Sequence, residues 1–566
     1  MARSNDQTTN MKQRLHFLAA AFVGLGLTTS AQAEPATTIP HLRKQGAATQ
    51  LIVDGKPFLA LAAELNNSSA SSLSYMKPIW PRLAASHINT VLATVSWELI
   101  EPQEGQFDFK LVDGLIQEAR ANRLHLVFLW FGSWKNGKST YQPLWVKTNQ
   151  ARFPLIQNEQ GKNLPTMTTL SDANRDADTR AFAALMRHLR EFDGAKHTVL
   201  MIQVENEVGS LDTPRDYCPA ANAAFAGPVP TELIDYLQAH KATLIPQLRQ
   251  AWEANGFRSS GTWEEVFGKS TANKDDWKAF SCFTEEVFMA WNYARYIGYV
   301  AAAGKAQYAL PMYVNAWLKQ QGTGLPGMYP SGGPLPQVMD IWRAGAPAID
   351  MISPDIYVPN FTEWCDWYTQ SANPLFIPES RGDAQGVAHA IWAFGQHDAI
   401  GYSPFGIGLA AGADTELARG YDVLSQVAPL ILSAQGKGTM AALLLESGGS
   451  PQTVRLGNYN IEIRSSLRSF GPASGSNAPP DRVAGLFIST GPDDFVIVGR
   501  SMNVYFSAAD NPSDSVGLGT VEEGVYENGR WRPGRRLNGD ETPEWKALRF
   551  RSDDYSIQRV KLYRYR

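Results

Sequence analysis

Two apolar segments of this chain end in glutamates, in the manner of a catalytic carboxylate pair. One segment ends in Glu205, Asn206 and Glu207, and another, much further along the chain, ends in Glu379. Burying an ionised carboxylate without a partner costs on the order of several kcal/mol, so such charges usually lie where water, a partner or a substrate meets them. The remaining elements are therefore expected to hold Glu207 and Glu379 face to face.

A facing pair of carboxylates is the arrangement that cleaves a glycosidic bond. One carboxylic acid protonates the leaving oxygen, and carboxyl groups about 5–5.5 Å apart form a covalent intermediate and retain the anomeric configuration, whereas wider pairs invert it. In a regular strand Glu205 and Glu207 point to one face and Asn206 to the other. We expect Glu207, at the outer end, to be the acid, and the deeper Glu205 to orient neighbours or the sugar. A backbone irregularity at the strand end would turn Asn206 toward the site as well.

Eight apolar segments alternate with helical patterns and predict strands. They cover residues 58–65, 89–96, 124–131, 199–207, 310–316, 349–357, 375–379 and 401–405. Near-continuous apolar strands separated by helices indicate a parallel sheet that is covered on both faces, and eight of them can close as a barrel. An open doubly wound sheet is the alternative, but no glycine-rich phosphate loop follows the first strand. The predicted fold class is therefore α/β, a (β/α)8 TIM barrel.

Active sites of such barrels lie at the carboxyl ends of the strands. Polar or aromatic residues stand at most of these ends, and they form the candidate site. The candidate catalytic residues are Glu207 and Glu379, and the candidate substrate-binding residues are Asn206, Glu205, Tyr357, Trp97, Glu64, Trp134 and Asn315. For Tyr357, Trp97 and Trp134, packing in the core explains the residue type equally well.

The chain divides into three predicted parts. Residues 1–33 carry Lys12 and Arg14, an apolar run too short to span a bilayer and a small-x-small site at Ala31-Gln32-Ala33, which predict a signal peptide and export to the periplasm or the medium. Residues 34–436 are predicted to form the barrel domain, beginning with a loose leader up to residue 50. Residues 437–566 are predicted to form an all-β, sandwich-like domain, because short alternating runs are separated there by Gly, Pro and Asn turns.

Other local patterns are weaker. Residues 51–53 and the Asp54-Gly55 pair predict a strand and a tight turn. Helical patterns cover residues 232–255, 275–303 and 414–433, and the alternating runs of the last part cover residues 440–445, 460–465, 484–488, 495–498, 502–506 and 561–565. Residues 471–481 are a loop rich in Gly, Pro and Ser.

The composition excludes several classes of partner. A formal net charge of −4 shows no basic excess, so neither nucleic acid nor an anionic membrane surface is expected to bind. The three cysteines are far apart, the nine histidines are scattered and no CxxC or HExxH pattern occurs, so we predict no metal and no cofactor. No cysteine stands directly after the cleavage site, so a lipid anchor to the membrane is not expected. The oligomeric state is left open.

At these residues the chain resembles the clan of retaining barrel glycosidases whose acid follows an Asn at the end of strand four. Within that clan, residues 203–209 (QVENEVG) and 97–109 (WELIEPQEGQFDF) look like glycoside hydrolase family 35, the β-galactosidases. The strand-three segment at residues 130–137 departs from the family, because it lacks the Glu of the larger members. Glu98 stands where many members have Asn. Both departures concern the identity of the sugar.

The resemblance implies roles for four residues. Glu207 would be the acid/base, Glu379 the nucleophile, Asn206 a contact to the sugar 2-hydroxyl, and Tyr357 the tyrosine that touches the nucleophile. The C-terminal part looks like that of a bacterial subgroup met in plant cell-wall degradation, which implies an oligosaccharide partner such as a xyloglucan side chain.

Three hypotheses for the function follow. The first is an exported, retaining exo-β-galactosidase that acts on plant cell-wall oligosaccharides. The second is the same mechanism on another β-linked sugar, such as a xyloside or an arabinoside, which the departure at strand three favours. The third is a sugar-binding barrel without catalysis, which the intact pair of glutamates argues against.

Overall fold

The computed structural model describes residues 38–269, 278, 281–446, 449–465, 482–543, 546–551 and 554–566. Residues 38–566 form one compact unit. The predicted signal peptide and the predicted loop at residues 471–481 lie outside the described residues. Among the helices that are described, none combines the length and the apolar character needed to cross a membrane.

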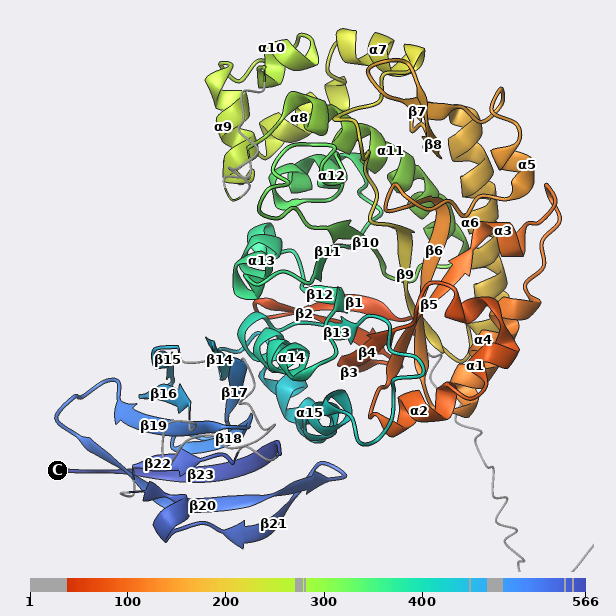
Figure 1. Cartoon of the computed structure of the whole chain (residues 1–566). Coiled ribbons are helices and arrows are strands. Elements are labelled where there is room, and N and C mark those ends of the chain that lie inside the picture. Colours follow the sequence, from red (N-terminus) through yellow and green to blue (C-terminus); the bar gives the residue numbers. More distant parts are fainter. Residues whose placement is uncertain are drawn as a thin grey trace, which may run out of the picture. The chain divides into compact units, whose positions relative to one another are not determined.

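Eight parallel strands close into a barrel inside a ring of helices (Figure 1). The strands are β4 (Ala60–Glu64), β5 (Thr90–Ser96), β6 (His125–Lys135), β9 (Val199–Asn206), β10 (Met312–Trp317), β11 (Met351–Ile356), β12 (Phe376–Ser380) and β13 (Gly401–Pro404). They follow one another around the ring in this order, because β13 pairs with β4 and β6 pairs with β9. All eight overlap the predicted segments, and the predicted TIM barrel is confirmed.

The helices cover the barrel and fill the connections between its strands. They are α1 (Leu73–Met76), α2 (Trp80–Ala85), α3 (Trp97–Ile100), α4 (Lys110–Ala121), α5 (Leu144–Lys147), α6 (Asp172–Asp193), α7 (Pro219–Ala226), α8 (Thr231–Ala239), α9 (Pro246–Ala254), α10 (Trp263–Phe267), α11 (Thr284–Gln307), α12 (Met339–Gly345), α13 (Phe361–Tyr368), α14 (Ala384–His397) and α15 (Glu416–Ala434). A short hairpin, β7 (Leu155–Gln157) and β8 (Asn163–Met167), precedes α6. Side-chain caps mark several starts, for example Thr415, whose hydroxyl accepts the Ala418 N–H of α15.

Two helix predictions needed correction. The pattern at residues 232–255 is not one helix but two, α8 and α9, because Pro246 lacks the N–H that would continue a helix and the preceding Ile245 is extended. The helix predicted from residue 275 begins at Thr284, and most of residues 270–280 lie outside the described residues.

A small antiparallel sheet closes the amino end of the barrel, where a loose leader was predicted up to residue 50. It consists of β1 (His41–Gln45), β2 (Ala48–Val53) and β3 (Lys56–Phe58). Leu51 and Val53 of β2 pack into the cluster of apolar side chains inside the barrel. The leader prediction is therefore wrong for residues 41–50, whereas the tight turn at Asp54 and Gly55 is present, with φ of 50° and 76°.

The same sheet meets the chain where the last barrel helix ends. Gly436 follows α15, and the Ala47 N–H donates to its carbonyl oxygen. A Cβ on Gly436 would lie 1.7 Å from the Gln45 carbonyl oxygen, and a Cβ on Gly46 would lie 2.2 Å from the Gly436 oxygen. Only two glycines allow the backbones to approach this closely.

After α15 the chain forms two antiparallel sheets that share one apolar core. The six-stranded sheet contains β14 (Met440–Glu446), β17 (Arg482–Ser489), β18 (Asp494–Gly499), β23 (Ser556–Tyr565), β20 (Ser515–Glu527) and β21 (Arg530–Arg536), in that order. The four-stranded sheet contains β15 (Gln452–Leu456), β16 (Tyr459–Ser465), β19 (Met502–Ala508) and β22 (Ala547–Arg549). The predicted all-β architecture is confirmed, although β15, β20, β21 and β22 were not predicted.

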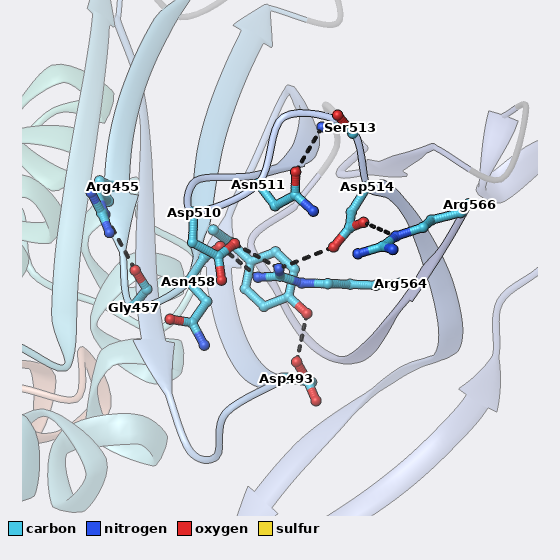
Figure 2. Close-up of polar contacts among 11 residues, drawn as sticks. Arg455, Gly457, Asn458, Asp493, Asp510, Asn511, Ser513, Asp514, Arg564 and Arg566 are labelled. Atoms are coloured by element: carbon cyan, nitrogen blue, oxygen red, sulfur yellow. Dashed lines mark hydrogen bonds and ion pairs between the residues drawn. The ribbon is translucent and has the colours of Figure 1, made fainter.

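Polar contacts tie the C-terminal strand β23 to loops of the same region (Figure 2). The Arg564 guanidinium donates to a carboxylate oxygen of Asp510 at 2.6 Å and to the Asn458 carbonyl oxygen at 2.9 Å. The Arg566 guanidinium donates to Asp514 at 2.8 Å. The last residues of the chain are thereby fixed to the turns that precede β16 and β20.

Candidate active site

The structure brings the two predicted catalytic residues together at the carboxyl ends of β9 and β12. One carboxylate oxygen each from Glu207, Glu379 and a third residue, Asp355 of β11, lie within 4.8 Å of one another. Glu207 and Glu379 are 8% and 5% exposed, so both carboxylates are buried but remain reachable from the barrel mouth. The two strands are not neighbours in the barrel, and the carboxylates meet across it.

The backbone at the end of β9 is irregular, which is the condition under which Asn206 was expected to face the site. Glu205 and Glu207 have φ of 63° and 45°, in the left-handed region that non-glycine residues rarely adopt and that costs about 1–3 kcal/mol each. The Glu207 N–H leaves the strand ladder and donates to the side-chain oxygen of Asn315 at 2.9 Å. Asn206 lies in the same network, with its amide nitrogen 3.5 Å from a Glu207 carboxylate oxygen.

Asn315 of β10 holds three of these groups in place. Besides accepting the Glu207 N–H, it donates from its amide to the Asn206 side-chain oxygen at 3.1 Å and to an Asp355 carboxylate oxygen at 2.8 Å. Its side-chain oxygen and nitrogen are therefore engaged with protein groups. Asn315, which was predicted to bind substrate, instead positions Asn206, Glu207 and Asp355.

Tyr357 and Glu64 also reach the site. The Tyr357 hydroxyl donates to a Glu379 carboxylate oxygen at 2.9 Å, while its side chain is 45% exposed. Glu64, the last residue of β4, is buried, and neither of its carboxylate oxygens has a hydrogen-bond donor among the described residues. Burial, and then the charge of Glu379, raises the pKa of Glu64 well above its usual range. Two buried acceptors without donors are suited to substrate hydroxyls.

Glu205 lies outside the carboxylate pair. It is fully buried, and its two oxygens accept the backbone N–H groups of Ser133 at 3.0 Å and Trp134 at 2.7 Å. Burial raises the pKa of Glu205 well above its usual range, with the neighbouring Asp178 as the second cause. Of the two predicted roles, the structure fits the orientation of neighbours and contradicts contact with a sugar.

Asp178 of α6 completes this second carboxylate cluster. It accepts hydrogen bonds from the Trp130 indole at 2.9 Å and the Ser133 hydroxyl at 2.6 Å. A Cβ on Gly132 would lie 2.6 Å from a Glu205 oxygen, so this position has no room for a side chain. The cluster therefore fixes the end of β6. This end carries Lys135, whose ammonium lies near Glu207.

Trp97 and Trp134 pack in the core and make no contact with the carboxylate pair. Trp97 is fully buried, and its indole donates to a Glu101 carboxylate oxygen at 2.6 Å. Trp134 is 1% exposed, donates to the Met167 carbonyl oxygen at 3.1 Å and lies edge-on to Tyr296. The prediction that both bind substrate was wrong, because their rings point into the layer between the strands and the helices.

Two residues of the site were missed from the sequence, Lys135 and Asp355. The Lys135 ammonium lies 3.7 Å from a Glu207 carboxylate oxygen, and its side chain is buried. Burial lowers the pKa of Lys135, but the surrounding carboxylates more than offset this and raise it above its ordinary value; they are Glu207, Glu379, Glu64 and Asp355. Asp355 was visible as a charge within an apolar strand two residues before Tyr357, and Lys135 as a charge directly after Trp134.

The electrostatics favour a bound proton at the carboxylate pair. Burial, followed by the charge of Glu207, raises the pKa of Glu379 to about 8, while Lys135 and the Tyr357 hydroxyl act in the opposite direction. Burial also raises the pKa of Asp355 well above its usual range. The site can therefore carry one acid and one carboxylate near neutral pH, which is what bond cleavage by such a pair requires.

The same carboxylates are the group among the described residues that could ligate a metal ion. Glu207, Asp355 and Glu379 offer three oxygen ligands within 4.8 Å of one another. The Lys135 ammonium already supplies a positive charge next to Glu207. The predicted absence of a metal stays a prediction.

Comparison with known families supports the sequence analysis in part. A family model described as beta-galactosidase, glycoside hydrolase family 42, matches residues 75–286, and a model described as a domain of unknown function (DUF5597) matches residues 417–549. Family 42 is a different family of the same clan as family 35, so the broader likeness to the β-galactosidases of that clan is supported, and the assignment to family 35 is not. The family 42 match includes Glu207 and ends before Glu379.

Individual relatives carry the same description. A protein named beta-galactosidase from Xanthomonas manihotis is 28% identical over 223 residues, which are 37% of this chain and 33% of that protein. The chain thus spans about a third of the length of this curated relative. Among solved structures, the β-galactosidases of the psychrophilic Marinomonas ef1 and of Bacillus circulans sp. alkalophilus match with 16% and 14% identity and TM-scores of 0.43 and 0.44. These matches cover 67% and 66% of this chain and 60% and 57% of those chains.

Proposed function

We propose that this protein is a retaining β-galactosidase that removes terminal galactose through a covalent intermediate on Glu379. The separation of the carboxylate pair carries the proposal. Oxygens of Glu207 and Glu379 lie within 4.8 Å of each other, which fits the about 5–5.5 Å of retaining enzymes and leaves no room for the water that inverting pairs hold at about 6.5–9.5 Å. The family 42 match and the beta-galactosidase relative support galactose as the sugar.

In the first step the Glu379 carboxylate attacks the anomeric carbon while the protonated Glu207 gives its proton to the leaving oxygen. The Tyr357 hydroxyl, which donates to Glu379, stabilises the carboxylate form that attacks. In the second step the Glu207 carboxylate removes a proton from water, and the resulting hydroxide displaces Glu379 from the sugar. The backbone at Glu207 is fixed by Asn315, so the same carboxyl group can serve in both steps without moving far.

The remaining polar groups would bind the galactose. The Asn206 amide lies next to Glu207 and could donate to the 2-hydroxyl, and the Glu64 carboxyl, whose oxygens have no partner among the described residues, could form hydrogen bonds with other hydroxyls. Export by residues 1–33 and action on plant cell-wall oligosaccharides, including xyloglucan side chains, belong to the proposal. They rest on the targeting pattern and on the likeness of the C-terminal part to that of a bacterial subgroup met in plant cell-wall degradation.

The first test is a panel of nitrophenyl glycosides: β-galactoside, β-xyloside, β-glucoside and α-arabinoside. Preferred release of nitrophenol from the β-galactoside is expected. Preference for a pentoside would replace galactose but keep the mechanism, and binding of sugars without turnover across the panel would favour a barrel that only binds them.

Azide rescue separates the two glutamates. With Glu379→Gly, azide should replace the nucleophile and give the α-galactosyl azide, whereas with Glu207→Ala it should attack the covalent intermediate and give the β-galactosyl azide. Glu118→Gln, a change at a partly exposed glutamate of α4, is the matched control and should give neither product. The same anomer from both variants would contradict the assigned roles.

A further inference from the structure

A hollow lies at the carboxyl ends of β6 and β10, the two neighbours of β9, the strand that leads to Glu207. It is a cleft of about 470 Å³ formed by the segment after β6, the loop after β9, and the end of β10 with the loop that follows. The residues that matter for its chemistry are Lys138, Leu211, Asp212, Trp317 and Met328. Its volume falls in the range of sites that hold small molecules, about 300–1,000 Å³.

The cleft and the catalytic centre share strand β10, and each also takes a lysine from β6 or the segment directly after it. Trp317 is the last residue of β10 and is the register partner of Asp355 on β11. It stands two residues beyond Asn315, so both side chains lie on the same face of the strand. Lys138 follows Lys135 by three residues, where β6 has just ended.

The walls of the cleft are held in place by backbone contacts. The Asp212 N–H donates to the Gly327 carbonyl oxygen at 2.9 Å, and Ser210 and Ser331 exchange backbone hydrogen bonds at 3.0 and 2.9 Å. These bonds tie the loop after β9 to the loop after β10. The cleft is therefore a feature of the fold rather than a chance gap between two side chains.

The side chains of the cleft match the two faces of a sugar ring. The partly exposed Trp317 ring offers an apolar face for the C–H side of a pyranose, and Met328, 45% exposed, extends it. Exposed Lys138, whose ammonium lies 5.5 Å from the Trp317 ring centroid, and exposed Asp212 offer a donor and an acceptor for the hydroxyls at the edge. Such a mixture is typical of carbohydrate recognition and unsuited to a purely apolar ligand.

We propose that this cleft binds the sugar on the leaving-group side of the scissile bond, with Trp317 as its stacking platform. The inference rests on the proposed function. An acid that protonates the leaving oxygen must stand on the leaving-group side, and β6 and β10 are the two neighbours of β9, the strand that carries Glu207. Glu379 lies on β12, beyond β11, so the galactose is expected on that side and the next sugar in the cleft.

The test compares two galactosyl donors that share the galactose and differ in the leaving group. β-Galactosyl fluoride has a leaving group of one atom and does not use the cleft, whereas a disaccharide with glucose or xylose as its second sugar does. For Trp317→Ala the ratio of kcat/KM for the disaccharide to that for the fluoride should fall about tenfold or more, and Trp317→Phe should restore part of it. The wild type serves as reference with whichever disaccharide it hydrolyses faster.

Two further variants test whether the effect is specific to the cleft. Lys138→Met, at an exposed position that does not endanger folding, should lower the same ratio about threefold. Trp531→Ala, at a partly exposed tryptophan of β21, is the matched control and should leave the ratio at the wild-type value. Transfer of galactose to added xylose, measured against hydrolysis of nitrophenyl β-galactoside, should decline in Trp317→Ala in parallel.

The outcomes separate the two proposals. An unchanged ratio for Trp317→Ala and Lys138→Met, or an equal loss on both donors, would show that the cleft does not bind the leaving sugar while the β-galactosidase activity stands. A wild-type protein that hydrolyses neither donor would overturn the proposed function, and the cleft proposal with it.

Discussion

Two buried carboxylate clusters in the described part of the chain differ in how their acceptors are used. In the cluster of Asp178 and Glu205, backbone N–H groups, an indole and a hydroxyl satisfy the oxygens. In the cluster around Glu207 and Glu379, Glu64 has no hydrogen-bond donor among the described residues, and a buried lysine supplies the counter-charge. Burial raises pKa values in both, so a raised pKa alone does not mark the catalytic cluster. The feature that marks the catalytic cluster is the presence of unsatisfied acceptors that face the barrel mouth.

The largest expected effect tests directly whether the two clusters differ in function. Glu379→Gln should lower kcat by at least about 10⁴-fold, because the amide cannot form the covalent intermediate, whereas Glu205→Gln should lower it by less than about tenfold. Nitrophenyl β-galactoside hydrolysis measures both. Losses of similar size would mean that the two clusters do not differ in function.

Tyr357→Phe removes one hydrogen bond to the nucleophile without altering the ring. A hydrogen bond to a charged group contributes about 1.5–3 kcal/mol, so kcat should fall by roughly 10- to 100-fold. Tyr293→Phe, at a buried tyrosine that packs on Trp134, is the control and should leave kcat unchanged. A Tyr357→Phe variant with wild-type kcat would remove the hydroxyl from the mechanism.

Lys135→Met tests the counter-charge of the site. Lys135 lowers the pKa of Glu379, so its removal should shift the acidic limb of the kcat/KM profile upward by about one pH unit or more. Activity at pH 7 should then fall about tenfold and recover partly at higher pH. A profile that keeps its acidic limb would show that Lys135 does not influence the ionisation of the pair.

The last effect concerns stability and separates the clusters by the size of the change. Because the folded-state pKa of Glu379 is raised to about 8, its contribution to stability is full below the unfolded pKa near 4.5 and is lost as pH rises through 8. At pH 8 the free energy of unfolding of Glu379→Gln should therefore exceed that of the wild type by roughly a few kcal/mol, and its urea midpoint should be higher. At pH 4.5 no such gain is expected.

Glu205→Gln should gain less. Burial raises the pKa of Glu205 as well, but the amide presents only one acceptor to the two N–H groups of Ser133 and Trp134, and the lost hydrogen bond costs about 1–3 kcal/mol that offsets the gain at pH 8. Urea unfolding of both variants at the two pH values provides the measurement. A gain in stability at pH 8 for Glu205→Gln as large as that for Glu379→Gln would contradict the distinction between the clusters.

The fold could be predicted because apolar runs of strand length report burial on both faces, and this held for all eight barrel strands. The predicted site also gathered Glu207, Glu379, Asn206, Asn315 and Tyr357, because each lies in or directly after the carboxyl end of a barrel strand, and these ends face the barrel mouth. A charge or amide after an apolar run was a usable signal. Glu64 obeyed the same rule.

The errors arose where tertiary contacts override the alternation of side chains. Strand β6 continues to Lys135 and its register with β9 shifts between Trp130 and Lys135, so the face of Trp134 could not be counted from the strand start. The left-handed backbone at Glu205 depends on its bonds to the β6 backbone, which no local pattern encodes. Strands β20 and β21 are largely exposed and mixed in composition, and therefore lacked the alternating pattern of the other strands.

The close contact of Gly46 and Gly436 has a consequence for the connectivity of the barrel region. This contact places the segment that enters the barrel against the segment that leaves it, although 390 residues separate them in the chain. A short linker could join these segments, and new chain ends could be opened in an exposed loop, giving a circular permutant with the same strand order around the ring. Two contacts thus join the beginning and the end of the barrel region: the pairing of β13 with β4, and the contact between the segments at Gly46 and Gly436.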